Sequence, residues 1–163
     1  RGLGDVYKRQ TGIDARYCHT YIIGEHGDSE VAAWSITNIA GMSMKSFFEH
    51  YGKCTDEDLQ AMYSEVKNSA YEIIQKKGAT YYAIATAVAR IVECISGGEN
   101  SVLTISSVLN GEYGIEDISL SIPTQVSGYG VERILDVPFN EIELQGLRSS
   151  AKTLKDSLKS IGF

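Results

Sequence analysis

The chain has 163 residues, 43% of them hydrophobic, so it is long enough to bury one proper core. A formal net charge of -6 argues against a nucleic-acid surface. No apolar run approaches the length of a membrane span, and the first residues lack the pattern of a signal peptide. The three cysteines are isolated, which favours free thiols in a reducing cytoplasm. None lies at ligand spacing from His19 or His26, so no metal site is expected.

Residues 1–10 (RGLGDVYKRQ) differ in character from the rest of the chain. They contain two glycines and lack the apolar stripe of a helix. We interpret them as a non-native or disordered segment, such as a translated adapter, and exclude them from fold reasoning. A genuine flexible N-terminus is the alternative. Residues 11–163 are predicted to form one domain.

Short elements followed by a long helix are predicted in the first half. Residues 19–23 are apolar enough for a strand that delivers His26, and residues 33–40 indicate a strand or irregular structure. A helix is predicted to begin at Thr55, because acidic residues fill the turn that follows it. It is predicted to end at Gly78, after two lysines.

The second half is predicted to continue with a helix, three strands and a final helix. The first of these helices begins at about Thr80, carries an apolar stripe and stops at two glycines, 97–98. Alternating or β-branched residues predict antiparallel strands over 101–109, 118–126 and 131–137. A spacing of three or four between apolar residues predicts an amphipathic helix over 144–161. This order indicates an α+β fold, and no GxGxxG follows a strand, so no dinucleotide-binding unit is expected.

The most informative segment is residues 23–29, Ile-Gly-Glu-His-Gly-Asp-Ser, which follows an apolar run. Glycines on both sides of His26 give the backbone freedom and leave space for a ligand to approach the imidazole. A histidine can give and take a proton near neutral pH. The segment therefore predicts a catalytic histidine; a turn histidine with no task is the alternative.

All seven positions fit the active-site signature of the L-lactate dehydrogenases. Four further stretches resemble bacterial members of that family in the same order: residues 12–16, 34–41, 77–85 and 130–135. From Thr11 onward the chain is similar to the second half of such an enzyme. The resemblance implies the C-terminal-domain fold of the lactate/malate dehydrogenases, with antiparallel strands and long helices and without the Rossmann domain.

The resemblance also implies a function. The chain would be the substrate-side domain of an NAD-dependent L-lactate dehydrogenase, which interconverts pyruvate and L-lactate in fermentation after glycolysis. Such a protein is expected to be a cytoplasmic homo-oligomer, a tetramer, with His26 as its catalytic acid and base. The family's aspartate partner for this imidazole and its substrate-binding arginine lie upstream of Thr11. Neither has a counterpart here, so we expect the isolated chain to be inactive; Asp28 belongs to the signature and is not that partner.

Four other residues acquire expected roles from the resemblance. Thr80 matches the position that borders the substrate, and Ile84 matches the apolar residue that packs on the nicotinamide ring. An ordinary N-cap threonine and a buried core isoleucine are the alternatives. His19 matches a histidine that helps to bind the effector fructose 1,6-bisphosphate at a subunit interface, and Arg16 is expected to be a neighbouring phosphate contact, because the family's own arginine for that site lies upstream. For His19 the alternative is a strand-edge histidine with no ligand.

Two other functions stay open at this point. The chain could belong to another L-2-hydroxy acid dehydrogenase, acting on 2-hydroxyisocaproate or malate, because the discriminating loop would lie upstream. It could also be a non-enzymatic oligomerisation module with a vestigial site. Thr80 and the run from Glu25 to Ser29 favour lactate.

Overall fold

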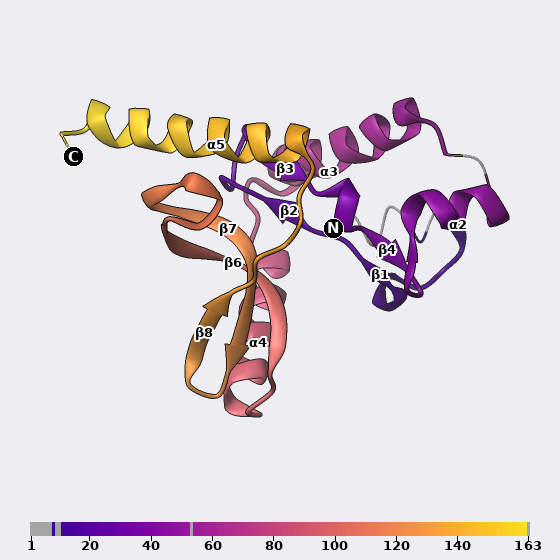
Figure 1. Cartoon of the computed structure of the whole chain (residues 1–163), viewed down its shortest axis with the longest axis horizontal. Coiled ribbons are helices and arrows are strands. Elements are labelled where there is room, and N and C mark those ends of the chain that lie inside the picture. The colour runs from indigo at the N-terminus through magenta and orange to yellow at the C-terminus, as the bar shows by residue number, and fades with distance from the viewer. Residues whose placement is uncertain (1–7, 9–10, 53, 163) are drawn as a thin grey trace. The chain divides into compact units, whose positions relative to one another are not determined.

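The computed structural model describes Lys8, residues 11–52 and residues 54–162 (Figure 1). Most of the segment 1–10 therefore lies outside the described residues. The chain divides into two compact units. The first contains the described residues up to Thr20 together with residues 37–93, and the second contains residues 21–36 and 94–162.

The first unit is built on a small sheet and two helices. An η1 turn (Ala15–Tyr17) leads into β1 (Cys18–His19), which pairs with β4 (Asn38–Ile39), and β4 pairs with β5 (Met42–Ser43). Helix α2 (Met44–Tyr51) packs on β4 and β5. The Ser43 side chain caps this helix by accepting a hydrogen bond from the Ser46 N–H at 3.2 Å. The buried apolar side chains of the unit include Cys18, Ile39, Phe47 and Met62.

Helix α3 (Asp56–Lys77) confirms both predicted ends of the first long helix. Thr55 and Asp58 form a capping box, in which the Thr55 hydroxyl accepts from the Asp58 N–H and the Asp58 carboxylate accepts from the Thr55 N–H. Gly78 ends the helix at a φ of 78° and donates its N–H to the Ile74 carbonyl. Within α3, Met62 is buried, whereas Ile74 is exposed.

Helix α4 (Tyr82–Ser96) begins two residues after the predicted start. The Tyr81 carbonyl accepts the hydrogen bond from the Ala85 N–H at 2.8 Å, so Tyr81 and not Thr80 stands at the N-terminal boundary. The apolar stripe has the predicted spacing, yet Ile84, Val88 and Val92 are 56%, 53% and 56% exposed. The burial that periodicity predicts for Ile84 is therefore not found among the described residues.

The second unit contains an antiparallel sheet of β6 (Ser101–Asn110), β7 (Glu116–Ser127) and β8 (Gly130–Ile134), in that order. A short η3 turn (Glu112–Gly114) joins β6 to β7. The three strands confirm the predicted ones, although β8 ends three residues before the predicted limit of 137. Every strand pair in the described part of the chain is antiparallel, and helices and strands alternate in blocks, which confirms the α+β class.

The single strand predicted over residues 19–23 is wrong, because the chain changes sheets within it. His19 ends β1 in the first unit, whereas β2 (Ile22–Ile23) pairs with β3 (Val31–Ala32) in the second. Apolar content indicates strand propensity but does not specify the partner strand. The segment predicted over 33–40 divides similarly, into an η2 turn (Trp34–Ile36) and β4.

Helix α5 (Glu141–Ser160) confirms the predicted C-terminal helix and begins three residues earlier. Asn140 and Glu143 form its capping box, with bonds of 2.9 and 3.1 Å. The helix lies across β3 and β7 (Figure 1). Its Leu147 is 0% exposed and belongs to the core of the unit. That core consists of Ile23, Ala33, Leu109, Ile115, Ile118, Leu120, Ile122, Phe139, Leu147 and Ala151.

Candidate functional site

His26 lies in the loop of the β2–β3 hairpin, between Ile23 and Val31. The first loop residue, Gly24, extends the pairing of β2 to β7. Its N–H donates to the Ser121 carbonyl at 2.9 Å, and its carbonyl accepts from the Ser121 N–H at 2.8 Å. The buried end of β2 thus anchors the loop to the central strand of the sheet, and the exposed His26 follows two residues later.

Gly24 and Gly27, the glycines on either side of His26, are each closely approached by a side chain of the protein. Gly24 has a φ of 94°, a left-handed conformation that a side chain would strain. A Cβ atom at Gly24 would lie 2.7 Å from Ser150 Oγ, and one at Gly27 would lie 2.6 Å from Glu25 Oε1. The predicted backbone freedom is found at Gly24. The space that we expected a ligand to use is filled at both glycines by the protein itself.

A polar network closes the loop around His26. The Ser29 hydroxyl donates to Glu25 Oε2, and the Ser29 N–H reaches the same oxygen at 3.3 Å. The Glu25 N–H donates to Ser150 Oγ on α5 at 2.6 Å. Residues on both sides of His26 are therefore fixed to each other and to the helix behind them.

The His26 imidazole is exposed. Within residues 11–52 and 54–162, and at Lys8, no group forms a hydrogen bond or ion pair with this ring. The neighbouring carboxylates do not orient it: Glu25 bonds to Ser29, and Asp28 is exposed on the same loop. A loop held by these hydrogen bonds thus presents an exposed imidazole, a group that in general can exchange a proton with a bound molecule.

Thr80 and Ile84 belong to the first unit, whereas His26 belongs to the second. Thr80 is half-buried and lies between α3 and α4, and its hydroxyl has no partner among the residues that the structure describes. The Tyr81 carbonyl accepts the first helical bond of α4, so the alternative role of Thr80 as the N-cap is not supported. Ile84, on the first turn of α4, presents an exposed aliphatic side chain.

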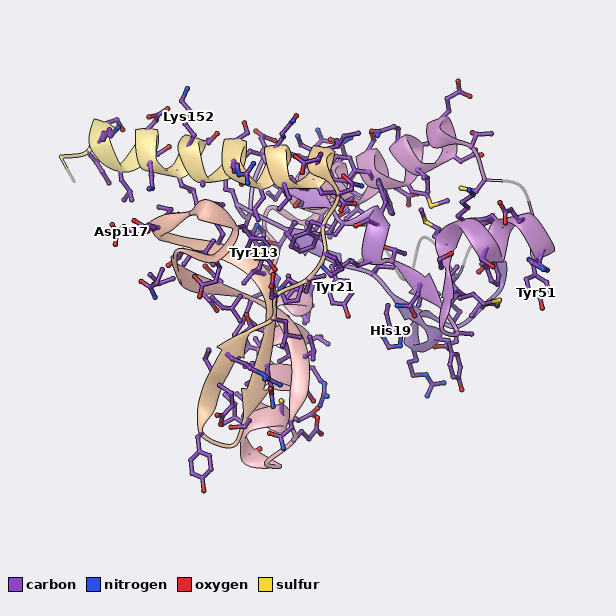
Figure 2. All side chains as sticks on the ribbon, viewed as in Figure 1. His19, Tyr21, Tyr51, Tyr113, Asp117 and Lys152 are labelled. Carbon is purple, nitrogen blue, oxygen red and sulfur yellow. The ribbon has the colours of Figure 1, made fainter. Side chains whose placement is uncertain are left out.

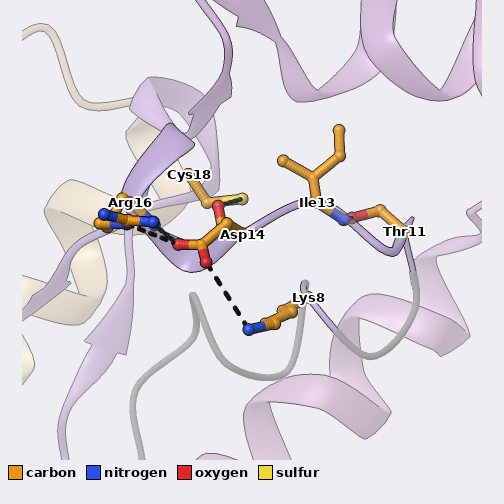
Figure 3. A network of polar contacts seen from close by, with 6 residues as sticks. All are labelled: Lys8, Thr11, Ile13, Asp14, Arg16 and Cys18. Atoms are coloured by element: carbon orange, nitrogen blue, oxygen red, sulfur yellow. Dashed lines mark hydrogen bonds and ion pairs between the residues drawn. The ribbon is translucent and has the colours of Figure 1, made fainter.

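Arg16 is engaged by a neighbouring carboxylate that sequence reasoning did not single out (Figure 3). Its backbone N–H and its guanidinium Nε both donate to Asp14 Oδ1, at 3.0 and 3.1 Å. These two bonds hold the pKa of the Asp14 carboxyl below its ordinary value. The Lys8 ammonium lies 3.6 Å from the other carboxylate oxygen. A phosphate at Arg16 would have to compete with Asp14.

His19 is exposed at the end of β1, opposite Asn38 of β4, and its side chain projects from the strand in Figure 2. No hydrogen bond or ion pair to its ring occurs in the described part of the chain. Both readings of His19, as an effector ligand and as an idle strand-edge residue, require this exposure.

Two residues that support the His26 loop were missed by sequence reasoning. Ser150 is fully buried on α5, and its partner Glu25 is 125 residues away in the chain. A signal was available, because Ser150 falls between Leu147 and Leu154 at helical spacing, on the apolar face of the predicted helix. Ser29 was quoted within the signature without a role.

Other cavities among the described residues lie away from the predicted site residues. A cavity of about 620 Å³ lies between α2 and the start of α3 and is lined by Met44, Phe48 and Leu59, among others, but by none of the predicted site residues. No group of three His, Cys, Asp or Glu side chains is arranged to hold a metal in this part of the chain. All three cysteines are free thiols. None of the described helices is both long and apolar enough to cross a membrane.

Comparison with known proteins identifies relatives along almost the whole chain. Residues 5–162 match the family model for the lactate/malate dehydrogenase, alpha/beta C-terminal domain. The chain is 55% identical over 150 residues to the L-lactate dehydrogenase of Acetivibrio thermocellus, covering 91% of this chain and 47% of the relative. It is 51% identical over 157 residues to that of Thermoanaerobacterium saccharolyticum, covering 96% and 50%.

Solved structures agree in fold. The minor L-lactate dehydrogenase of Enterococcus mundtii, in its ligands-bound form, is 40% identical with a TM-score of 0.92, over 98% of this chain and 51% of that one. A lactate dehydrogenase from a Medee basin deep-sea metagenome library is 36% identical with a TM-score of 0.95, over 99% and 52%. The chain spans about half the length of the curated relatives that it matches. It belongs to the lactate/malate dehydrogenase family, through the α/β C-terminal domain of those enzymes.

Proposed function

We propose that this chain supplies the substrate-side half of an NAD-dependent L-lactate dehydrogenase, with His26 as its general acid and base. The observation that carries the proposal is the exposed, unpartnered imidazole of His26 on a loop held rigidly by β7 and α5. The identity of 55% to an L-lactate dehydrogenase supports the choice of reaction.

Reduction of a 2-oxo acid requires a proton at the carbonyl oxygen, a hydride at the carbon and a grip on the carboxylate. Protonated His26 can donate the first and polarise the carbonyl. In the direction of lactate oxidation the neutral ring accepts the hydroxyl proton. His26 has no carboxylate partner among the described residues, and we infer that an orienting aspartate and the carboxylate-binding arginine are supplied by residues of the full-length enzyme outside the described ones.

One described residue, Ile84, is suited to contact the NAD that this proposal requires. Ile84 is 56% exposed at the first turn of α4, and an aliphatic side chain there offers apolar surface to a nicotinamide ring. When bound, NAD supplies and accepts the hydride. The free hydroxyl of Thr80 stands four residues before Ile84, where it would border a short substrate such as pyruvate.

We infer further that the complete protein is a cytoplasmic homo-oligomer, a tetramer, active in the fermentation of pyruvate after glycolysis.

Fructose 1,6-bisphosphate would act as an effector through His19 and, to a smaller extent, through Arg16, because Asp14 already binds the Arg16 guanidinium. His19→Asp should abolish activation without lowering the maximal rate, since it places a negative charge opposite a phosphate. Asp14→Asn should lower the half-saturating bisphosphate concentration. Activation that is unchanged in His19→Asp would remove His19 from the effector site.

The test of the proposed function uses the full-length protein that contains this chain. The wild type should reduce pyruvate faster than oxaloacetate or 2-oxoisocaproate, measured as kcat/KM with NADH. His26→Asn should lower kcat roughly 10²–10⁴-fold, because general acid catalysis is lost, while the Kd for NADH changes little. His50→Asn, the same change at an exposed histidine of α2, serves as the matched control.

Three results would contradict the proposal in different ways. A wild-type kcat in His26→Asn would make His26 a turn residue with no task. A preference for oxaloacetate or 2-oxoisocaproate would assign the protein to another L-2-hydroxy acid dehydrogenase. Oligomerisation without turnover of any 2-oxo acid would favour the non-enzymatic module.

A further inference from the structure

Ser150 is a buried polar residue directly behind the His26 loop. It is 0% exposed and lies on the face of α5 that carries Leu147 and Ala151 into the core. A polar side chain in such a position is costly unless it is hydrogen-bonded. The hydrogen bonds of the Ser150 side chain are all formed with residues of the loop that contains His26.

The contacts of Ser150 fix the residues on both sides of His26. Ser150 Oγ accepts the Glu25 N–H at 2.6 Å and lies 3.2 Å from the Ser29 hydroxyl. The Ser29 hydroxyl in turn reaches the Glu25 carboxylate. The Glu25 backbone is thus held by α5, and the Glu25 side chain is held by Ser29, three residues beyond His26.

The shape of the loop is matched to a small polar residue on the helix. Gly24 has a φ of 94°, and a Cβ atom there would lie 2.7 Å from Ser150 Oγ and 3.2 Å from Ser150 Cβ. The loop can approach α5 this closely because Gly24 has no side chain. Gly24 also bonds to Ser121 of β7 through both backbone groups. The start of the loop is therefore clamped between the sheet and the helix.

We propose that Ser150 is a positioning residue for the proposed proton transfer: it holds the Glu25 amide so that the next residue, His26, meets the substrate oxygen correctly. This inference rests on the function proposed above for His26. Ser150 is buried behind the loop and acts through Glu25, without touching a reacting atom. Misplacing a catalytic group by about 1 Å can cost on the order of 10²-fold in rate, so loss of one anchoring bond should slow the chemical step measurably.

The test compares Ser150→Ala with Ser149→Ala in the full-length enzyme. Ser149 is the adjacent, exposed serine of the same helix, so the chemical change and the helix propensity are matched. We expect Ser150→Ala to lower kcat for pyruvate reduction roughly 10-fold, with KM for pyruvate and Kd for NADH within about twofold of wild type. A solvent deuterium isotope effect on kcat should appear or increase, because proton transfer from His26 becomes slower. Ser149→Ala should resemble the wild type in each measurement.

A second variant and a second readout separate positioning from folding. Ser150→Cys keeps a side chain of similar shape, but sulfur is a weaker acceptor, so kcat should fall between wild type and Ser150→Ala. Hydrogen exchange of the Glu25 amide should be faster in both variants than in the wild type, because its acceptor is lost or weakened. A drop in activity that merely follows the folded fraction, with no isotope effect, would overturn the positioning role.

The experiment distinguishes failure of this inference from failure of the proposed function. A wild-type enzyme that fails to reduce any 2-oxo acid would reject the proposed function, and the positioning role would fall with it. An active wild type with unchanged kcat, isotope effect and Glu25 exchange in Ser150→Ala would reject the role of Ser150 alone.

Discussion

Helices α4 and α5 carry equally clear apolar stripes, and the chain treats the two stripes differently. In α5 the stripe packs on β3 and β7, with Leu147 fully buried and Ala151 beside it in the core. In α4 the stripe of Ile84, Val88 and Val92 is more than half exposed. Periodicity is a property of the helix sequence, whereas burial requires a partner surface. A repeating apolar pattern therefore predicts a helix reliably, but it does not predict which surface, if any, buries the apolar stripe.

The largest expected effect on stability tests this contrast by truncating one residue in the apolar stripe of each helix. Leu147→Ala should lower the free energy of unfolding of the chain by about 2–5 kcal/mol, because it removes a buried side chain and leaves a cavity. Val88→Ala should change it by less than about 0.5 kcal/mol, as expected for an exposed site. Denaturant unfolding monitored by circular dichroism measures both. Equal losses would show that α4 is covered in solution to the same degree as α5.

The next largest effect on the free energy of unfolding is expected at Tyr113, which packs against the core of the second unit. The Tyr113 hydroxyl donates to the Leu135 carbonyl at 2.7 Å and accepts from the Val137 N–H at 2.9 Å. Tyr113→Phe leaves both backbone groups without this partner and should cost about 1–3 kcal/mol of unfolding free energy. Tyr129→Phe is the matched control, because Tyr129 is 98% exposed. A loss as small as that of the control would mean that water replaces the Tyr113 hydroxyl at no cost.

The smallest expected effect lies in the first unit, at the exposed Asp14. Its bonds to the Arg16 backbone and guanidinium lower the pKa of its carboxyl in the folded state. A lowered folded pKa means that Asp14 stabilises the fold above its unfolded pKa, and that this contribution is lost as the pH falls through the folded pKa. Titration followed by carboxyl-carbon NMR should place the Asp14 pKa below that of an ordinary aspartate, and Arg16→Gln should raise it. An unchanged pKa in that variant would mean that the Arg16 guanidinium is not a cause, because the backbone N–H of residue 16 is kept.

Local sequence patterns correctly predicted those helices and strands whose ends depend on neighbouring residues. Thr55 and Gly78 mark the ends of α3 through bonds within one turn of themselves, and the strands β6 and β7 contain the two segments whose residue pattern predicted strands. The pattern of the signature also located His26 on a loop after a buried strand. Each of these features depends on residues a few positions apart.

Long-range contacts account for what the sequence did not predict. Residues 19–23 were expected to form one strand, but the pairing of His19 with Asn38 and of Ile23 with Val31 distributes them between two sheets. The bond between Glu25 and Ser150 joins residues that are 125 positions apart. One short-range contact was also missed: Asp14 was not predicted as the partner of Arg16, because a carboxylate two residues away can turn toward or away from its neighbour.

The most direct test of the central claim, proton exchange by His26, is the pH dependence of kcat/KM in both directions of the reaction. In the proposed mechanism, pyruvate reduction requires the protonated imidazole and lactate oxidation requires the neutral one. In the full-length wild type, kcat/KM for reduction should fall with rising pH and that for oxidation should rise. The residual activity of His26→Asn should show neither change. Profiles that move in the same sense in both directions, or that persist in His26→Asn, would contradict the assignment of His26 as the acid and base.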